Sequence, residues 1–255
     1  MDENSGGFDI QPLGDSAAKF IIVLVKFKTR GNLRFISHAE VLRVFQRACV
    51  RAGIEMQYSQ GFNPRPRLSL PLPRSVGVET EDDLLCFRID QSTSAQANKS
   101  ISDFCTSMKT KLSEQLPGDF ELVSVEVSKA RTAPAPRTAT YVLAVQQEYV
   151  NEKLKARIER LLASESLIVQ RSIYGKDTRL KTQDTRHKTE DRGQKTVDVR
   201  GFLESIVLDE RSIVVECKIS SAGTIRVEEI LELLELDVGK LAEPIRRTRV
   251  QWQQT

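Results

Sequence analysis

The chain has 255 residues, of which 40% are hydrophobic and 29% charged, the composition of a globular protein rather than a disordered or fibrous one. Its formal charge of +3 is too small to indicate nucleic-acid binding by itself, so the positions of the charges must decide that question. The longest apolar run, 20–25, is too short to span a bilayer, and the four cysteines lack the spacing of a zinc or iron–sulfur site. We therefore expect a reduced cytoplasmic protein with no membrane contact, no metal and no cofactor.

The N-terminal part of the sequence changes character near residue 19. Residues 1–18 are rich in Gly, Asp and Ser without periodicity, which predicts a disordered tail. The run FIIVLVKFKT (20–29) consists mainly of β-branched and aromatic residues, which predicts a strand covered on both faces. Ser37 is followed three residues later by Glu40, which predicts a capping box at the start of a helix that ends near Gly53.

Two strands (67–74 and 83–90), a helix (94–114) and a strand (120–128) are predicted next. The resulting order, βαββαβ, is that of the ferredoxin-like fold, whose sheet runs 4-1-3-2 with strands two and four at its edges. Pro71 and Pro73 cannot donate to a strand ladder, which agrees with an edge position for 67–74. Residues 19–130 are therefore predicted to form a first ferredoxin-like unit.

The same order recurs after a proline-rich segment. RTAPAPR (131–137) predicts a stiff linker, and 138–255 predicts a second ferredoxin-like unit. Its predicted elements are a strand (140–147), a helix (151–164), two strands (166–173 and 212–220), a helix (226–236) and a strand (244–253). An insertion, 174–210, begins as a charged loop and ends in a segment, 196–208, that is apolar enough to pack as an extra strand or helical turn. The prediction is an α+β protein with two tandem ferredoxin-like (βαββαβ) units, each with an antiparallel sheet.

Arginines gather around the first predicted helix. Arg43, Arg47 and Arg51 recur every four residues and share one helix face, while Arg34 precedes the helix and Arg65 and Arg67 follow it. Such a row is either a solvated surface or a phosphate-binding stripe. Arginine suits phosphates and base edges, and Phe35, Tyr58 and Phe62 offer stacking faces, so we expect contact with nucleic acid, structured RNA in the first place.

The segment YSQGFNPRP (58–66) contains the Gly, Asn and Pro residues of a tight, rigid turn. It could simply deliver the chain into the edge strand. It could also present the polar groups of Tyr58, Ser59, Gln60 and Asn63 to a ligand. The sequence leaves both interpretations open.

His38 is the one histidine placed for acid–base chemistry, because its ordinary pKa lies near neutrality. No Asp, Ser or Cys accompanies it in a local catalytic motif, and it directly follows the predicted helix cap. We expect a structural or ligand-contacting residue rather than a catalyst. His187, in the polar insertion, is expected to be solvent-exposed, and the chain lacks the P-loop, GxGxxG, HExxH, GxSxG and CxxxCxxC signatures.

Residues 31–77 resemble the radical-SAM-linked protein family that carries the DUF2344 domain. The matching positions are Gly31, Leu33, Arg34, Phe35, Ser37, His38, Arg43, Arg47 and the run from Tyr58 to Pro64. The sequence departs from the family pattern at Ala39-Glu40, where Leu-Asp is common, and at Arg65, where His is common; the lost histidine weakens an acid–base role for this loop. The resemblance implies a bacterial protein, often fused to or encoded beside a B12-binding radical SAM protein. Because this chain has no cluster-binding cysteine triad, it would be the accessory half of such a system.

These observations lead to one expectation and two alternatives. The expected function is that of a non-catalytic accessory or substrate-recognition protein, which presents RNA or another phosphate-bearing ligand to a B12-binding radical SAM protein. The alternatives are a metal-independent RNA-processing or RNA-modifying enzyme that uses His38, and a protein-binding adaptor that pairs through its edge strands. The expected ligand- or RNA-binding residues are Arg34, His38, Arg43, Arg47, Arg51, Tyr58, Ser59, Gln60, Asn63, Arg65 and Arg67.

Overall fold

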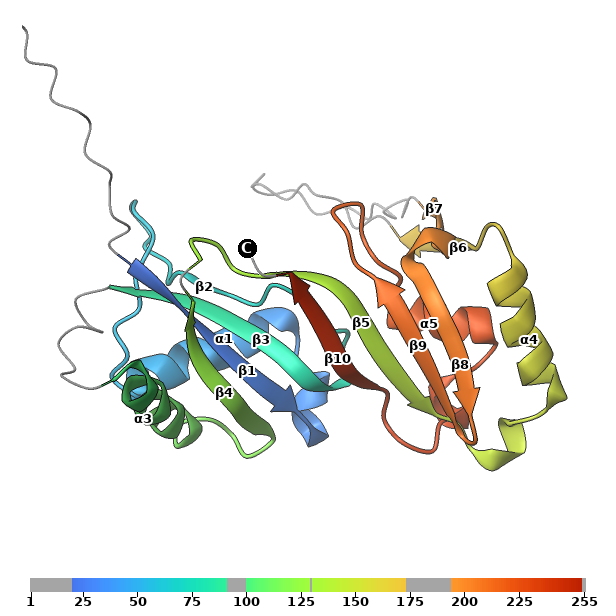
Figure 1. Cartoon of the computed structure of the whole chain (residues 1–255), viewed down its shortest axis with the longest axis horizontal. Coiled ribbons are helices and arrows are strands. Elements are labelled where there is room, and N and C mark those ends of the chain that lie inside the picture. The colour runs from blue at the N-terminus through green and yellow to red at the C-terminus, as the bar shows by residue number, and fades with distance from the viewer. Residues whose placement is uncertain (1–19, 91–99, 129, 173–193, 254–255) are drawn as a thin grey trace, which may run out of the picture.

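The computed structural model of the chain describes residues 20–90, 100–128, 130–172 and 194–253 (Figure 1). The predicted tail 1–18, His187 and most of the predicted insertion lie outside these ranges. Within them the chain is α+β, as predicted, with a mostly antiparallel sheet. The helices are α1 (His38–Arg51), α3 (Ile101–Ser113), α4 (Glu152–Ala163) and α5 (Val227–Leu234). The strands are β1 (Phe20–Thr29), β2 (Leu68–Ser69), β3 (Glu79–Asp90), β4 (Phe120–Ser128), β5 (Ala135–Ala144), β6 (Ile168–Ser172), β7 (Gln194–Asp198), β8 (Leu203–Asp209), β9 (Ser212–Lys218) and β10 (Arg246–Gln253).

The first half has the strand order that its sequence predicts. β1 pairs antiparallel with both β3 and β4, and β2 pairs antiparallel with β3, which gives the order 4-1-3-2. β2 is only two residues long, much shorter than the predicted 67–74. Pro71 and Pro73 lack the N–H groups that would continue its ladder along β3. The rest of that edge of β3 is thereby left for another strand.

The last strand, β10, takes this free edge and joins the two halves. It pairs in parallel with the start of β3, where Arg247 lies opposite Thr80, and antiparallel with β5. The sheet therefore runs β4-β1-β3-β10-β5-β9-β8 without interruption. This differs from the expectation of two separate sheets, because a parallel pairing between segments so far apart in the sequence leaves no local signal.

The second half differs from its prediction at one edge. The predicted strand 166–173 is found as β6, but β6 pairs with β7 in a separate two-stranded sheet. The position beside β9 is occupied instead by β8, which comes from the end of the insertion and buries Leu203 and Ile206. An extra strand was one of the two expectations for that segment. β5 begins at Ala135, inside the segment 131–137 that was expected to be a linker.

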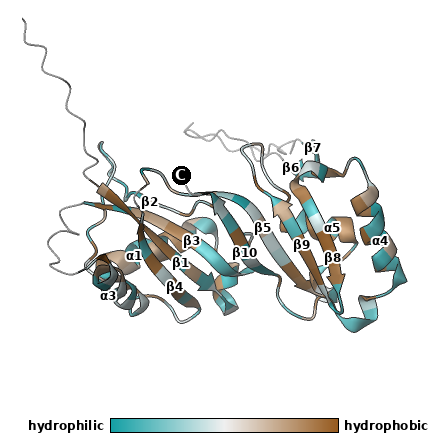
Figure 2. Cartoon of the chain, in the orientation of Figure 1, coloured by the Kyte–Doolittle hydropathy of each residue, from teal (hydrophilic) through white to brown (hydrophobic). Residues whose placement is uncertain are grey.

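Helices cover one face of the sheet. α1 opens with the predicted capping box of Ser37 and Glu40, and with α3 it packs on a core that contains the rings of Phe27, Phe45 and Phe120. α4 and α5 share the core of the second half with β5, β8 and β9. Figure 1 shows α1 and α5 behind the strands, and Figure 2 shows hydrophilic and hydrophobic residues side by side on α1 and α4, as amphipathic packing requires. No helix in the described ranges is long and apolar enough to cross a membrane.

The opposite face of the sheet, which we call the open face, carries no helix in the view of Figure 1. In the first half its buried residues are Ile22, Leu84 and Cys86, and Ala133 and Trp252 pack against them. Along β1 and β3 these residues alternate with those that face α1 and α3. The open face is therefore only partly covered, by the segment around Ala133 and by the end of β10.

Candidate nucleic-acid interface

Residues 57–67 form a narrow hairpin, which we call the finger. The backbone N–H of Ser59 donates to the Arg65 carbonyl (2.7 Å), that of Arg65 donates to Ser59 Oγ (3.0 Å), and that of Arg67 donates to the Gln57 carbonyl (2.7 Å). At the tip, Gly61 has a φ of +123°, a conformation that favours glycine. The finger is thus held by its own hydrogen bonds, and Ser59, one of the predicted ligand contacts, already uses its hydroxyl oxygen for the turn.

The tip of the finger is exposed to solvent together with its aromatic residues. Phe62 has a relative exposure of 106% and Tyr58 one of 46%. Gln60 and Asn63 are exposed as well. A phenylalanine that lies entirely in water on a well-held turn contributes nothing to the core, so its flat face is available to stack on a ligand.

Two arginines stand opposite each other at the base of the finger. Because Leu68 pairs with Phe87, Arg67 lies opposite Arg88, whose N–H donates to the Arg67 carbonyl (3.0 Å). The Arg88 guanidinium lies over the ring of Phe20, 4.2 Å from its centre. Within the described chain, no carboxylate forms an ion pair with Arg65, Arg67 or Arg88. The sequence prediction missed Arg88, although its place between the buried Phe87 and Ile89 indicates that it faces away from the helices.

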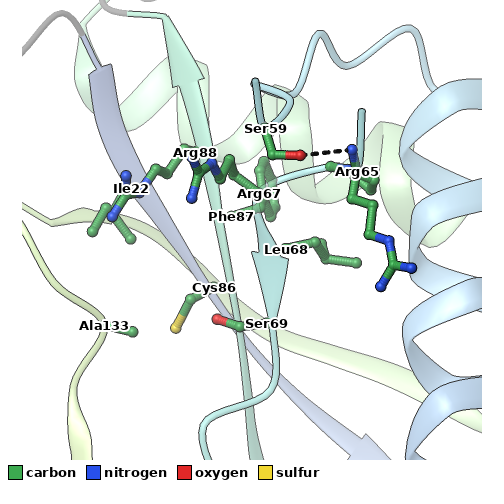
Figure 3. Close-up of a pocket in the computed structure, with 11 residues that line it drawn as sticks. Ile22, Ser59, Arg65, Arg67, Leu68, Ser69, Cys86, Phe87, Arg88 and Ala133 are labelled. Carbon is green, nitrogen blue, oxygen red and sulfur yellow. Dashed lines mark hydrogen bonds between the residues drawn. The ribbon is translucent and has the colours of Figure 1, made fainter. Parts of the chain in front are cut away.

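These arginines line a pocket of about 360 Å³ on the open face (Figure 3). Its floor includes the apolar groups of Ile22, Cys86 and Ala133, and the base of the finger forms one wall. In Figure 3, Arg67 and Arg88 lie next to each other, whereas the guanidinium of Arg65 is directed toward α1. A second pocket, of about 310 Å³, lies farther along the same face between Lys26 and Trp252.

The predicted arginine row on α1 belongs to a different surface. Arg43 and Arg47 are exposed on the side of α1 away from the sheet, while Arg51 donates to the Gln115 carbonyl (2.7 Å). The row therefore lies on the helix layer, and the pocket lies on the open face. The structure does not bring the row together with Arg67 into one continuous basic surface.

Two other predicted site residues, Arg34 and His38, lie against other parts of the chain. Arg34 donates to the Gly31 carbonyl (2.7 Å), lies 3.9 Å from a Glu79 carboxylate oxygen, and stacks on Phe35. His38 is the first residue of α1, and its Nδ1 atom is buried without a hydrogen-bond partner in the described part of the chain. No described side chain orients the imidazole as a catalytic base requires.

The comparison with known families confirms the DUF2344 domain that the sequence resembles. Residues 23–229 match the family DUF2344, described as an uncharacterized protein conserved in bacteria. The chain belongs to the DUF2344 family. No curated protein matches the sequence. The DUF2344 match includes α1, the finger and Arg88, and it ends before β10.

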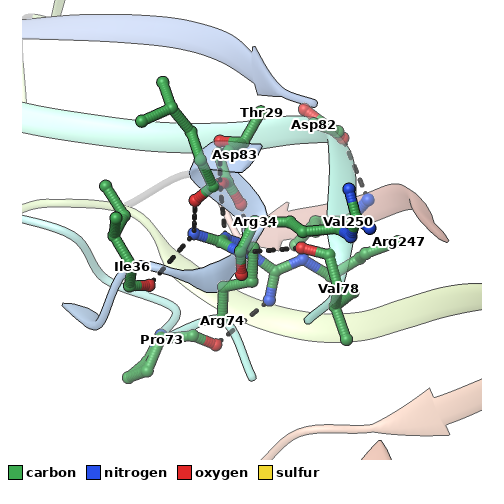
Figure 4. Close-up of polar contacts among 11 residues, drawn as sticks. Thr29, Arg34, Ile36, Pro73, Arg74, Val78, Asp82, Asp83, Arg247 and Val250 are labelled. Atoms are coloured by element: carbon green, nitrogen blue, oxygen red, sulfur yellow. Dashed lines mark hydrogen bonds and ion pairs between the residues drawn. The ribbon is translucent and has the colours of Figure 1, made fainter. Parts of the chain in front are cut away.

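A second arginine cluster of this DUF2344 protein is buried, where β10 meets β3 (Figure 4). Asp83, with a side chain only 8% exposed, forms an ion pair with Arg247 and lies 4.0 Å from Arg74. Arg74 also donates to the carbonyls of Leu33, Arg34, Ile36 and Val78, and Arg247 donates to that of Pro73. Burial lowers the pKa of Arg74, and the charge of Asp83 opposes this shift. The cluster is a structural joint in which two buried guanidiniums share one carboxylate and donate to backbone carbonyls.

Three of the four cysteines of the DUF2344 chain are buried in the fold. Cys49, Cys86 and Cys217 are buried, and burial raises the pKa of each thiol to about 12. A protonated thiol is a poor nucleophile and a poor metal ligand. Among the residues that the structure describes, no three His, Cys, Asp or Glu side chains are grouped so as to hold a metal ion.

Proposed function

We propose that this protein is a non-catalytic substrate-recognition module that binds RNA through the finger and the adjoining open face. The observation that carries the proposal is the wholly exposed Phe62 at the tip of a well-held hairpin, close in sequence to Arg65 and Arg67. Neither arginine has an ion-pair partner among the described carboxylates. An aromatic face beside unpaired arginines is the combination with which proteins bind unstacked bases and their phosphates.

The proposed partner is a B12-binding radical SAM protein in the cytoplasm, and this part rests on the resemblance of residues 31–77 alone. In such a pair the cluster-bearing protein performs the chemistry, and the present chain holds the substrate. The buried, scattered thiols are compatible with a reducing compartment.

We also propose that the two halves are ferredoxin-like units that have merged into one sheet. In the first half the strand order 4-1-3-2 supports this interpretation, and in the second half β10-β5-β9 follows the same order, with β8 in the place of β6. In RNA-binding modules built on a four-stranded sheet, bases stack on the face of the sheet. The open face of the first half, with Phe20, Arg88 and Lys26, has residues suited to that role.

Fluorescence anisotropy with a labelled single-stranded RNA, titrated over a series of salt concentrations, tests RNA binding. Stacking on an aromatic side chain contributes about 1–3 kcal/mol per base, so Tyr58→Ala/Phe62→Ala should weaken binding by about tenfold or more. Val238→Ala, which trims an exposed apolar side chain in the second half, is the matched control and should bind as the wild type does. Absence of binding at low salt, or equal binding by both variants, contradicts the proposal.

A triple substitution of Arg43, Arg47 and Arg65 by alanine measures the part played by phosphate contacts. Each lost contact should reduce the slope of log affinity against log salt by about 0.7 for a single strand. Because Arg43 and Arg47 lie on the helix layer, a slope that changes by no more than one contact would show that RNA does not bind along the arginine row of α1.

Affinity capture with a B12-binding radical SAM protein from the same cell, with and without nuclease, tests the partner. Capture that survives nuclease indicates direct protein contact, as an adaptor pairing through the outer edges of β4 and β8 would show. Capture that nuclease abolishes indicates an RNA bridge. Failure to capture in either condition contradicts the proposed partnership. If the protein cleaves or modifies RNA, and His38→Ala abolishes this activity, the protein is an RNA-processing or RNA-modifying enzyme and the proposal of a non-catalytic module is wrong.

A further inference from the structure

The pocket on the open face brings two positive charges close together, and an anionic ligand would neutralise them. Arg67, directly before β2, lies opposite Arg88 on β3 and accepts a hydrogen bond from its backbone N–H, and like charges at opposed positions destabilise strand pairing. No carboxylate of the described chain neutralises either one. We infer that the pocket binds the phosphate end of a nucleoside 5′-monophosphate, as a subsite of the RNA-binding surface proposed above.

The orientation of Arg88 suits a phosphate. Its guanidinium carbon lies over the ring of Phe20, 4.2 Å from the ring centre, and among the described residues no carboxylate pairs with the guanidinium, so its N–H groups can donate to a phosphate. A phosphate monoester carries nearly two negative charges at neutral pH and three acceptor oxygens, enough to pair with both arginines. A carboxylate, with one charge, would leave one of them uncompensated.

The remaining walls suit a flat ring attached to that phosphate. Ile22 and Cys86 are each 3% exposed, and with Ala133 they give the floor an apolar surface. Ser69, exposed at the rim, can bond a sugar hydroxyl. The volume of about 360 Å³ lies within the range of small-molecule sites and is small enough to favour a single nucleotide.

The finger connects this subsite to a longer ligand. Ser59 and Arg65 belong to both the finger and the wall of the pocket. A terminal nucleotide bound in the pocket would therefore lie beside the finger, which carries Phe62 at its tip. The same phosphate monoester could come from a free mononucleotide or from the 5′ end of an RNA.

Isothermal titration calorimetry with the four nucleoside 5′-monophosphates, the corresponding nucleosides and inorganic phosphate tests the subsite. The monophosphates should bind about tenfold or more tightly than the nucleosides, because charged hydrogen bonds are lost with the phosphate. Arg67→Gln/Arg88→Gln should lower this affinity by a similar factor. Arg211→Gln, at an exposed arginine between β8 and β9, should leave it unchanged. Thermal unfolding of each variant verifies that it is folded.

Two RNA oligonucleotides that differ only in a 5′-phosphate or a 5′-hydroxyl distinguish the two sources. Tighter binding of the phosphorylated RNA, lost in the double variant, supports recognition of RNA ends. Mononucleotide binding without any preference between the two RNAs assigns the pocket to free nucleotides. RNA binding with no measurable binding of any monophosphate overturns the subsite and leaves the proposed function intact. Monophosphate binding that is equal in the wild type and the folded double variant also overturns it.

Discussion

Two pairs of arginines lie on or beside the same strand, β3, and their charges have different surroundings. Arg74 and Arg247 are buried around the carboxylate of Asp83, and backbone carbonyls accept most of their remaining hydrogen bonds. Arg67 and Arg88 lie at the surface a few residues away, and no described carboxylate pairs with them. The presence or absence of one carboxylate therefore distinguishes a joint that holds the fold together from a surface that is suited to an anion.

Removal of the central carboxylate should have the largest effect. Asp83→Ala leaves Arg247 buried without its counter-charge, and breaking one side of a buried pair costs about 3–5 kcal/mol of the free energy of unfolding. Urea denaturation measures this loss, and Asp209→Ala, at an exposed position, should change stability very little. A loss no greater than that of the control would mean that the cluster is not a joint.

Substitution of arginine by lysine should reduce stability much more in the buried pair than in the surface pair. Arg74→Lys should cost about 2–3 kcal/mol, because one ammonium group cannot serve the four carbonyls that the guanidinium satisfies, and each orphaned buried acceptor costs about 1–3 kcal/mol. Arg88→Lys, at the surface, should change stability by less than about 0.5 kcal/mol. Equal losses in urea denaturation would remove the distinction between the pairs.

Cys86 lies on β3 between Asp83 and Arg88 and reports whether the strand opens. Because burial raises the pKa of its thiol to about 12, the thiol should resist alkylation by iodoacetamide at mildly alkaline pH, while the less buried Cys105 reacts first. In Asp83→Ala the rate of Cys86 labelling should rise by at least about tenfold. A loss of about 1.4 kcal/mol in the free energy of unfolding raises the population of opened molecules by that factor. Mass spectrometry of peptides follows both sites. Unchanged labelling would show that β3 stays closed without Asp83.

The smallest effect is expected for the surface pair. Arg67→Gln removes one of two opposed like charges, so the free energy of unfolding should stay the same or rise by up to about 1 kcal/mol. A loss of stability from this substitution, measured in the same denaturation series, would show that Arg67 has a structural partner and would weaken the case for a ligand.

Local patterns predicted the first half of the fold well. The spacing of Ser37 and Glu40 gave the helix start, and the alternation of 120–128 gave β4 at its observed bounds. The prolines indicated an edge strand, but β2 is shorter than the predicted 67–74. Each of these features depends on residues close together in the sequence. The parallel pairing of β10 with β3 and the replacement of β6 by β8 depend on distant segments, so no local pattern could reveal them.

The candidate site shows the same limit. The finger was visible as a turn with polar and aromatic residues, but the sequence could not show that Phe62 points into solvent or that Ser59 bonds Arg65. Periodicity correctly placed Arg43, Arg47 and Arg51 on one helix. It could not show that the pocket lies on the opposite face of the sheet from that helix. The pairing of Arg67 with Arg88 follows only from the register of β2 and β3.

The position of β10 has a consequence for synthesis of the chain on the ribosome. β10 is the last strand in the described sequence, yet it lies in the middle of the sheet, between β3 and β5. Until residues 246–253 have emerged, β3 and β5 each present an unpaired edge to the surrounding solution. Nascent chains of this protein should therefore need protection from edge-to-edge association with one another until β10 has emerged and paired with both strands.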